Sequence, residues 1–237
     1  MVGGCIITKY TGKAMHLRIP DQLGGERVVA LNAFLFQHNR MLRTVQLPEN
    51  LRELGVWTFN DCPYLTAITV AAANPNYISM DGVLYTRDGT LVQMPEGHPA
   101  RMFAVPQGVK RIGFRAFEKC TSLENITLPD SLEHISFNAF SHCSGLRRIV
   151  IPATVKVIDT FAFSDCTALT SVKLNEGLTT LASHAFDGCA ELQNINLPKS
   201  LKKIGNSVFH GCDKLPQEIR KRSWDSPLAG VTKWFRT

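Results

Sequence analysis

The sequence predicts a mainly-β repeat solenoid, in which short parallel strands stack from one turn of the chain onto the next. The main observation is a cysteine that recurs every 23 residues, and a phenylalanine precedes each of these cysteines by three positions. The cysteines of this ladder are Cys120, Cys143, Cys166, Cys189 and Cys212. Apolar residues recur in the same register between them. A fixed period of this length is typical of solenoids, because each unit buries its apolar face only against its neighbours.

One repeat shows what each 23-residue unit, here called a rung, is expected to form. Residues 123–128 read L-x-x-I-x-L and alternate at their end like a short strand. Pro129 ends this strand, since proline cannot donate to a strand ladder. Leu132 and Ile135 predict a return segment on the opposite wall, and Ala-Phe-x-x-Cys at 139–143 predicts a compact turn that places the phenylalanine inward. We expect a single rung to be unfolded in isolation, because its apolar side chains need neighbours to cover them.

The same register extends toward both ends of the chain and predicts about seven rungs. Their central residues are Phe36, Phe59, Phe117, Phe140, Phe163, Phe186 and Phe209. Asn39 stands in the first rung where the others have cysteine, and Cys62 belongs to the second.

One segment breaks the period, because Cys62 and Cys120 are 58 residues apart, which is 35 more than one repeat. The turn signals Asp81-Gly82 and Asp88-Gly89 lie beside the apolar segments 83–85 and 91–94. Asp-Gly between apolar runs is a strong hairpin signal. We therefore predict a β-hairpin insertion over residues 71–104 that projects from the solenoid.

The repeat pattern L-P-x-x-L-x-x-I-x-x-x-A-F-x-x-C-x-x-L-x-x-I-x-L resembles the BspA-like leucine-rich repeat, a bacterial and protist class, over residues 10–215. The segment Tyr10-Thr11-Gly12 resembles the family's entry segment, and residues 74–85 resemble its inserted hairpin. The resemblance implies a leucine-rich repeat fold without enzymatic chemistry. It also implies a protein-binding or adhesion role at the surface or outside the cell.

The ends of the chain are expected to cap a single domain. The predicted segments are an entry or N-terminal cap (1–18), repeats (19–70), the hairpin insertion (71–104), repeats (105–215) and a C-terminal cap (216–237). Within the last segment, Pro216 and Glu218 favour a short helix over residues 215–224. Three large side chains are expected to cover apolar edge there: Trp224, Trp234 and Phe235.

The ladder cysteines are best interpreted as buried free thiols, which pack as small apolar side chains. The spacing of stacked strands would permit a disulfide, but an odd number of inward cysteines leaves one unpaired. Zinc is less favoured, because ligands along a line cannot close a tetrahedron and there is no C-x-x-C spacing. We expect no cofactor and no metal. Cys5 lies outside the ladder and is the better candidate for an accessible thiol.

The sequence does not predict an enzyme. His142 and Asp165 share a repeat column on adjacent rungs, so a contact between them is possible, but no serine or thiol nucleophile is placed beside them. Two solvated turn residues are the simpler interpretation. The chain also has no glycine-rich phosphate loop, no H-E-x-x-H and no G-x-S-x-G.

The main functional hypothesis is a scaffold for protein binding or adhesion. The outward positions of the leucine-rich strands are mostly small and polar, which suits a protein or glycan surface. Arg148 and Lys173 are the large charged exceptions, and Tyr85 on the hairpin is a candidate interface anchor. These three residues are the predicted binding residues, and the partner's identity and the oligomeric state stay open.

The alternative hypothesis is a polyanion-binding wall, since the formal net charge is +6 and part of it is clustered. The residues predicted to point outward from the return segments are Lys110, Arg111, Lys156, Lys202 and Lys203. Nucleic acid is the least favoured polyanion beside anionic lipid and acidic glycan, because no aromatic residue interleaves these cations.

Two compartments fit the sequence. Residues 1–18 show no basic stretch followed by an apolar one, so we expect no signal peptide within the chain, and no run is long enough to span a bilayer. That expectation and the reduced cysteines fit the cytoplasm, whereas the family resemblance fits a surface or secreted protein.

Overall fold

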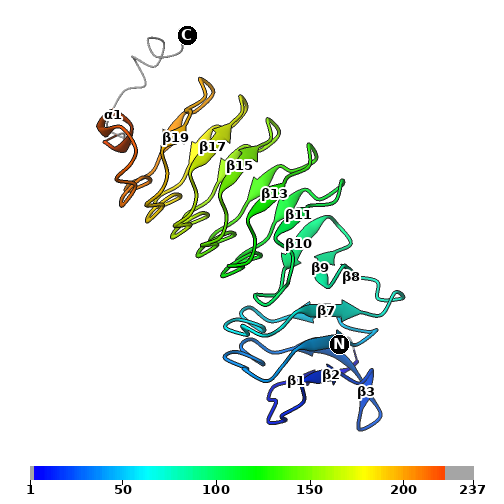
Figure 1. Cartoon of the computed structure of the whole chain (residues 1–237). Coiled ribbons are helices and arrows are strands. Elements are labelled where there is room, and N and C mark those ends of the chain that lie inside the picture. The colour runs from blue at the N-terminus through cyan, green and yellow to red at the C-terminus, as the bar shows by residue number, and fades with distance from the viewer. Residues whose placement is uncertain (1–2, 222–237) are drawn as a thin grey trace. The chain divides into compact units, whose positions relative to one another are not determined.

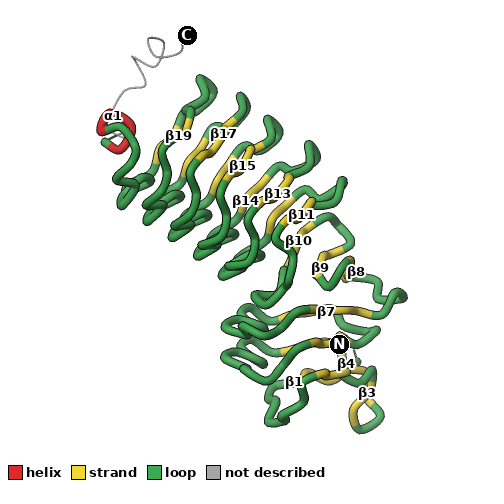
Figure 2. Tube along the Cα trace, in the orientation of Figure 1, coloured by secondary structure: helices red, strands yellow, loops and turns green. Residues whose placement is uncertain are grey.

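The computed structural model describes residues 3–221, which fall into two compact units that meet in sequence at Pro99 and Ala100. Short strands and turns make up nearly all of both units (Figure 2). The predicted fold class is confirmed, because each unit is a stack of 23-residue rungs whose parallel strands pair with the strands of adjacent rungs. The finer division into caps, repeats and insertion stays a prediction.

The second unit has two walls, each a parallel sheet of five strands (Figure 1). The leucine-strand wall contains β11 (Met102–Ala104), β13 (Asn125–Thr127), β15 (Arg148–Ile151), β17 (Ser171–Leu174) and β19 (Asn194–Ile195). The return wall contains β12 (Arg111–Ile112), β14 (His134–Ile135), β16 (Val157–Ile158), β18 (Thr180–Leu181) and β20 (Lys203–Ile204). Each residue pairs with the residue 23 positions later, as Ile149 pairs with Val172. The sequence period is therefore the sheet register.

The first unit repeats this plan and ends in an antiparallel sheet. Its leucine-strand wall contains β2 (His16–Arg18), β5 (Thr44–Leu47) and β7 (Ala67–Val70). Its return wall contains β1 (Cys5–Ile7), β4 (Glu26–Leu31) and β6 (Glu53–Leu54), with β3 (Gln22–Leu23) antiparallel to β4. The antiparallel sheet contains β8 (Tyr77–Met80), β9 (Val83–Thr86) and β10 (Thr90–Gln93).

The residues predicted as a hairpin thus form three antiparallel strands rather than two. The buried Asn74 anchors their start to the preceding rung, since its amide donates to the carbonyls of Pro48 (3.2 Å) and Leu51 (3.1 Å). Its side-chain oxygen accepts from the backbone N–H of Tyr77 at 2.8 Å. The antiparallel sheet is therefore fixed to the rung that precedes it.

The rung count is higher than the seven predicted from phenylalanine. Each unit begins with a leucine-wall strand that lacks the full repeat pattern, β2 in the first unit and β11 in the second. An aromatic ring nevertheless starts each stack: Tyr10 packs edge-on against Phe36 (5.1 Å), and Phe103 packs edge-on against Phe117 (6.0 Å). Because β11 pairs with β13, it belongs to the solenoid although it lies within residues 71–104.

The phenylalanine of each rung stacks on the next with nearly parallel rings. In the second unit the centroids of Phe117, Phe140, Phe163 and Phe186 are 4.8, 4.9 and 5.2 Å apart in turn, and all four residues are fully buried. These distances match the spacing of about 4.8 Å between paired strands. The rings therefore hold the turns at the same spacing that the sheets impose on the walls.

Two residues of each turn adopt a left-handed backbone conformation, two positions before and two after the phenylalanine. Asn138 (φ 55°) and His142 (φ 59°) flank Phe140, and the other rungs repeat the pair. This conformation costs about 1–2 kcal/mol for a residue with a Cβ. Hydrogen bonds to the next rung compensate for it, as when the N–H groups of Phe140 and His142 donate to the carbonyls of Ala162 (2.7 Å) and Ser164 (2.8 Å).

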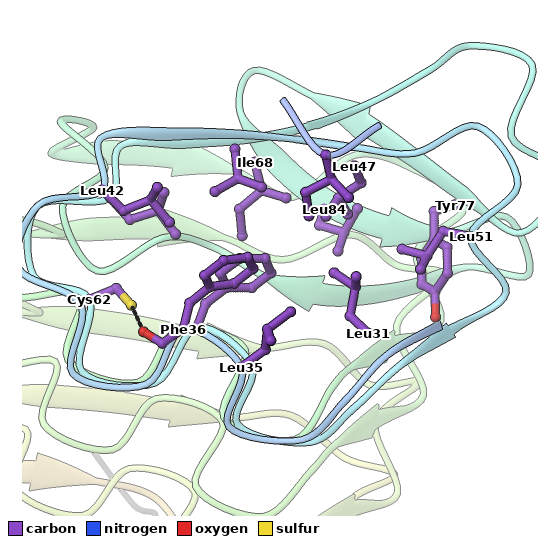
Figure 3. Packing of buried hydrophobic residues seen from close by; sticks show 14 of the residues in the cluster. Leu31, Leu35, Phe36, Leu42, Leu47, Leu51, Cys62, Ile68, Tyr77 and Leu84 are labelled. Carbon is purple, nitrogen blue, oxygen red and sulfur yellow. Dashed lines mark hydrogen bonds between the residues drawn. The ribbon is translucent and has the colours of Figure 1, made fainter. Parts of the chain in front are cut away.

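The ladder cysteines satisfy the carbonyl groups of these turns, in addition to packing. Each thiol donates to the phenylalanine carbonyl of the preceding rung, at 2.9 Å from Cys143 to Phe117 and 3.1 Å from Cys166 to Phe140. In the first unit, Cys62 does the same to Phe36 at 3.0 Å (Figure 3). Burial raises the pKa of Cys62 to about 12, so this thiol stays protonated and can donate. The predicted burial of the ladder cysteines is confirmed.

The first rung has Asn39 instead of a ladder cysteine. Its side-chain oxygen accepts from the N–H groups of Met41 and Leu42, each at 2.9 Å. The side chain is therefore used to close its own turn.

The described chain ends in a short helix, α1 (Gln217–Arg220), which begins after Pro216. It lies within the predicted helix over 215–224 and is shorter. The described residues stop at Lys221, so the predicted roles of Trp224, Trp234 and Phe235 lie outside them.

Replacing the central ring of the stack should strongly destabilise the second unit. Phe163→Ala removes contacts with both Phe140 and Phe186, and we expect a loss of about 3–5 kcal/mol in the free energy of unfolding. Chemical denaturation followed by circular dichroism measures it. A loss below about 1 kcal/mol would show that the stack does not carry the fold.

Thiol accessibility should follow burial. Cys5 is partly exposed, whereas the six cysteines of the rungs are buried. A thiol-specific reagent should therefore modify Cys5 in native protein and reach the others only after denaturation. Mass spectrometry of the labelled peptides identifies the sites. Rapid native labelling of Cys143 or Cys166 would contradict the arrangement.

Candidate binding surfaces

The leucine-strand wall of the second unit presents two outward rows of side chains. Strand pairing aligns Met102, Asn125, Arg148, Ser171 and Asn194 in the first row. The second row contains Ala104, Thr127, Val150 and Lys173. We call these two rows the leucine-strand face. Since one rung separates neighbours in a row, the face is a regular platform whose side chains are about 4.8 Å apart along the stack.

Arg148 and Lys173 lie where the sequence predicts them, exposed on adjacent strands β15 and β17. They are diagonal neighbours, because Arg148 pairs with Ser171 and Lys173 pairs with Val150. Apolar side chains stand beside the two cations: Val150 is 52% exposed, and Met102 at the start of the row is 76% exposed. The face therefore combines positive charge with exposed apolar surface, which is unusual for the side of a stable sheet that faces water.

Tyr85 does not belong to this surface, and its prediction as an interface anchor is wrong. It is 2% exposed within β9, where it pairs with Ile78 on one side and Leu91 on the other. Burial also raises the pKa of its phenol. The antiparallel sheet packs this side chain inward, so Tyr85 supports the core of the first unit.

The predicted basic residues all lie exposed on the return wall. Lys110 and Arg111 are at the start of the wall, Lys156 is at its centre, and Lys202 and Lys203 are at its end. The leucine-strand face lies on the other wall of the same unit. The two predicted binding sets, without Tyr85, therefore occupy separate surfaces.

A ridge of aromatic side chains borders the return wall, and the sequence analysis missed it. Phe114 is 41% exposed, and it stacks on Phe137 with a centroid distance of 5.7 Å. Phe137 contacts Phe161 at 5.9 Å, and Phe161 stacks on His184 at 4.6 Å. We call these four residues the aromatic ridge. Phe161 is 24 rather than 23 residues after Phe137, so a search at the repeat period does not find the row.

Imidazole and carboxylate groups pair along the outer edge of the turns. The contact considered for His142 and Asp165 forms at 3.7 Å, and both side chains are half exposed. A closer group lies two rungs away, where Asp187 accepts from His184 (2.9 Å) and His210 (2.8 Å). Burial raises the pKa of Asp187, but the bonds from His210 and His184 outweigh it and the pKa falls below its usual value. These groups join adjacent rungs.

Two general features of the described residues limit what the surfaces can do. Residues 3–221 contain no cluster of three or more histidine, cysteine or acidic side chains arranged to hold a metal ion. Nor does any helix in this part of the chain have the length and apolar character needed to cross a membrane.

Comparison with known families shows what the repeats resemble. The family model for the BspA type leucine-rich repeat region matches residues 16–81 and 98–216 in six copies. It thus covers well over half of the chain. No curated protein matches the sequence.

Solved bacterial structures share the fold. A leucine-rich cell surface protein from Faecalibacterium prausnitzii A2-165 has 29% identity and a TM-score of 0.75, with coverage of 85% of this chain and 55% of that one. The pneumococcal vaccine antigen PcpA (19%, TM-score 0.70) covers 88% and 58%. A leucine-rich repeat protein from Eubacterium ventriosum (20%, TM-score 0.66) covers 82% and 64%. The last two show the fold alone, and this chain spans less than two thirds of all three.

The His184–Asp187–His210 group should make stability depend on pH in a defined window. The hydrogen bond to Asp187 raises the pKa of His210 above 6.5, so its contribution is complete below pH 6.5 and is lost as the pH rises through the raised value. Asp187, with a lowered pKa, contributes above pH 3.8 and loses its contribution as the pH falls through the lowered value.

His210→Gln keeps a hydrogen-bond donor and removes this titration. Relative to the variant, wild-type protein should be more stable at pH 5.5 than at pH 8, and chemical denaturation at both values measures the difference. Thr127→Ala on the opposite wall is the control. An identical pH profile for wild type and His210→Gln would exclude the assignment.

Proposed function

The chain belongs to the BspA-type leucine-rich repeat family, and on this premise we propose that it is a non-catalytic scaffold for protein–protein interaction or adhesion. The binding surface in this proposal is the leucine-strand face of the second unit, with Arg148 and Lys173 at its centre. The relative from Faecalibacterium prausnitzii is described as a cell surface protein. That description supports a surface location for this chain as well.

The observation that carries the proposal is the composition of the leucine-strand face. Cationic side chains stand beside exposed valine and methionine on a backbone that the two sheets and the phenylalanine stack hold rigid. Protein interfaces have a similar mixture, with an apolar centre and charged groups that fix orientation. A rigid platform also loses little conformational entropy on binding.

The neighbouring side chains support binding rather than chemistry. The residues aligned with Arg148 in the first row are Asn125, Ser171 and Asn194, and they can donate and accept hydrogen bonds without gaining a strongly shifted pKa. Nearby, Arg101 forms an ion pair with Glu124 across adjacent rungs, so that cation is already compensated within the unit. Arg148 and Lys173 are the charges that a partner would meet.

Alanine variants of the leucine-strand face test the proposal. The chain is screened against an array of extracellular and cytosolic proteins, and the best hit is titrated against Arg148→Ala, Lys173→Ala and wild type. We expect at least one variant to weaken binding about fivefold or more, which corresponds to about 1 kcal/mol, with an unchanged melting temperature.

The matched control removes two lysines from the other wall. Lys156→Ala combined with Lys202→Ala should leave binding to the protein partner within about twofold. The proposal would be wrong if only this control variant weakened binding, or if all variants bound as tightly as wild type.

A further inference from the structure

Cations of the return wall occupy every second rung of one row. Backbone hydrogen bonds join Lys110, Glu133, Lys156, Thr179 and Lys202 in that order, each N–H donating to the carbonyl one rung earlier at 2.8–3.1 Å. The lysines therefore stand two rungs apart, about 9.6 Å at the usual strand spacing. Glutamate and threonine occupy the rungs between them. Arg111 and Lys203 add charge beside the two ends of this row.

These lysines are not neutralised within the described part of the chain. Among residues 3–221, no carboxylate forms an ion pair with Lys110, Lys156 or Lys202. The ammonium group of Lys156 makes one long hydrogen bond, 3.5 Å to the carbonyl of Ala153, which leaves its other donors available. Three exposed cations in a fixed row, without partners, attract an anionic ligand whose charges have the same spacing.

The aromatic ridge gives this row an apolar border. Phe114 follows Arg111 by three residues and Phe137 follows His134 by three residues, so the ridge begins just beyond the ends of the return strands. Its rings stack on one another, as Phe114 on Phe137 with an angle of 13° between the planes. Ring edges rather than open faces are therefore presented along the row of lysines.

We propose that the return wall of the second unit binds an extended acidic polysaccharide that carries a carboxylate on every second sugar. One sugar residue in an extended chain is about as long as one rung is wide, so alternate carboxylates would meet Lys110, Lys156 and Lys202. The neutral sugars would lie beside Glu133 and Thr179, with their C–H groups against the aromatic ridge. This site is separate from the leucine-strand face and does not depend on the proposed function.

Other polyanions fit this row less well. Phosphates of one strand in a DNA duplex rise by about 3.4 Å each, so lysines about 9.6 Å apart would leave most of them uncompensated. Single-stranded nucleic acid binds by stacking bases on open aromatic faces, and the faces of Phe114 and Phe137 cover each other. An extended acidic peptide presents side chains on one face about every 6.6 Å, which also differs from the lysine spacing.

Glu133 adds a repulsive element to the row. A polysaccharide with a carboxylate on every sugar would place a negative charge beside it, whereas an alternating polymer would place a neutral sugar there. Like charges at a contact disfavour the wrong ligand. The row therefore selects the alternating polymer over a uniformly charged one.

Moving one lysine by one rung tests the spacing without changing the composition. The probe is a fluorescently labelled hyaluronan decasaccharide, in which glucuronate alternates with N-acetylglucosamine, titrated with the full chain at low salt. The double variant Lys156→Thr, Thr179→Lys keeps the net charge but disrupts the alternation. We expect it to weaken binding about fivefold or more, whereas the triple variant K110Q/K156Q/K202Q abolishes binding.

Controls separate the polysaccharide from other ligands and from net charge. The variant R147Q/R148Q/K173Q removes three cations from the other wall and should bind hyaluronan within about twofold of wild type. Polygalacturonate of equal length should bind more weakly than hyaluronan, and Glu133→Gln should reduce that difference. The proposal is overturned if wild type does not bind hyaluronan, if the lysine exchange leaves affinity unchanged, or if oligothymidylate or polyglutamate binds more tightly.

Discussion

The structure depends on the match between two stacking distances at the phenylalanine turns. Buried rings 4.8–5.2 Å apart in the second unit repeat at nearly the spacing of hydrogen-bonded strands, so the turns and both walls advance together. Left-handed residues on either side of each phenylalanine allow the chain to turn sharply enough to place the ring inward. The cysteine thiol then donates to a phenylalanine carbonyl of the preceding rung that faces the interior. Removing any one of these parts would leave strain or an unpaired group in a buried turn.

Because the turns and walls keep one register, the surface of each unit is a set of rows with one side chain per rung. A function can then be encoded by which residue stands at each rung of a row, without any change in the core. On the leucine-strand face this gives a small polar platform around Arg148 and Lys173. On the return wall it gives lysines at alternate rungs. The two rows show how one core can hold two chemically different surfaces.

The periodic part of the fold could be predicted from the sequence, because a buried rung admits few alternatives. Phe140 and Cys143 are fully buried as expected, and the exposed positions of Arg148 and Lys173 follow from strand alternation. Segments without the period were less predictable. Tyr85 was expected on a projecting hairpin, but a third strand, β8, packs beside it and the side chain is buried. The hydrogen bonds of Asn74 that position this sheet are long-range in sequence and leave no local signal.

Native-state hydrogen exchange of the turn amides tests the central claim most directly. The N–H groups of Phe117, Phe140 and Phe163 each donate to the carbonyl of the next rung, at 2.8, 2.7 and 2.8 Å. If stacking of the turns holds the second unit together, these amides exchange only when the whole unit unfolds, with the same free energy as the strand amides of β15 and β17. Rapid exchange of the turn amides beside protected strands would show that the sheets alone carry the fold.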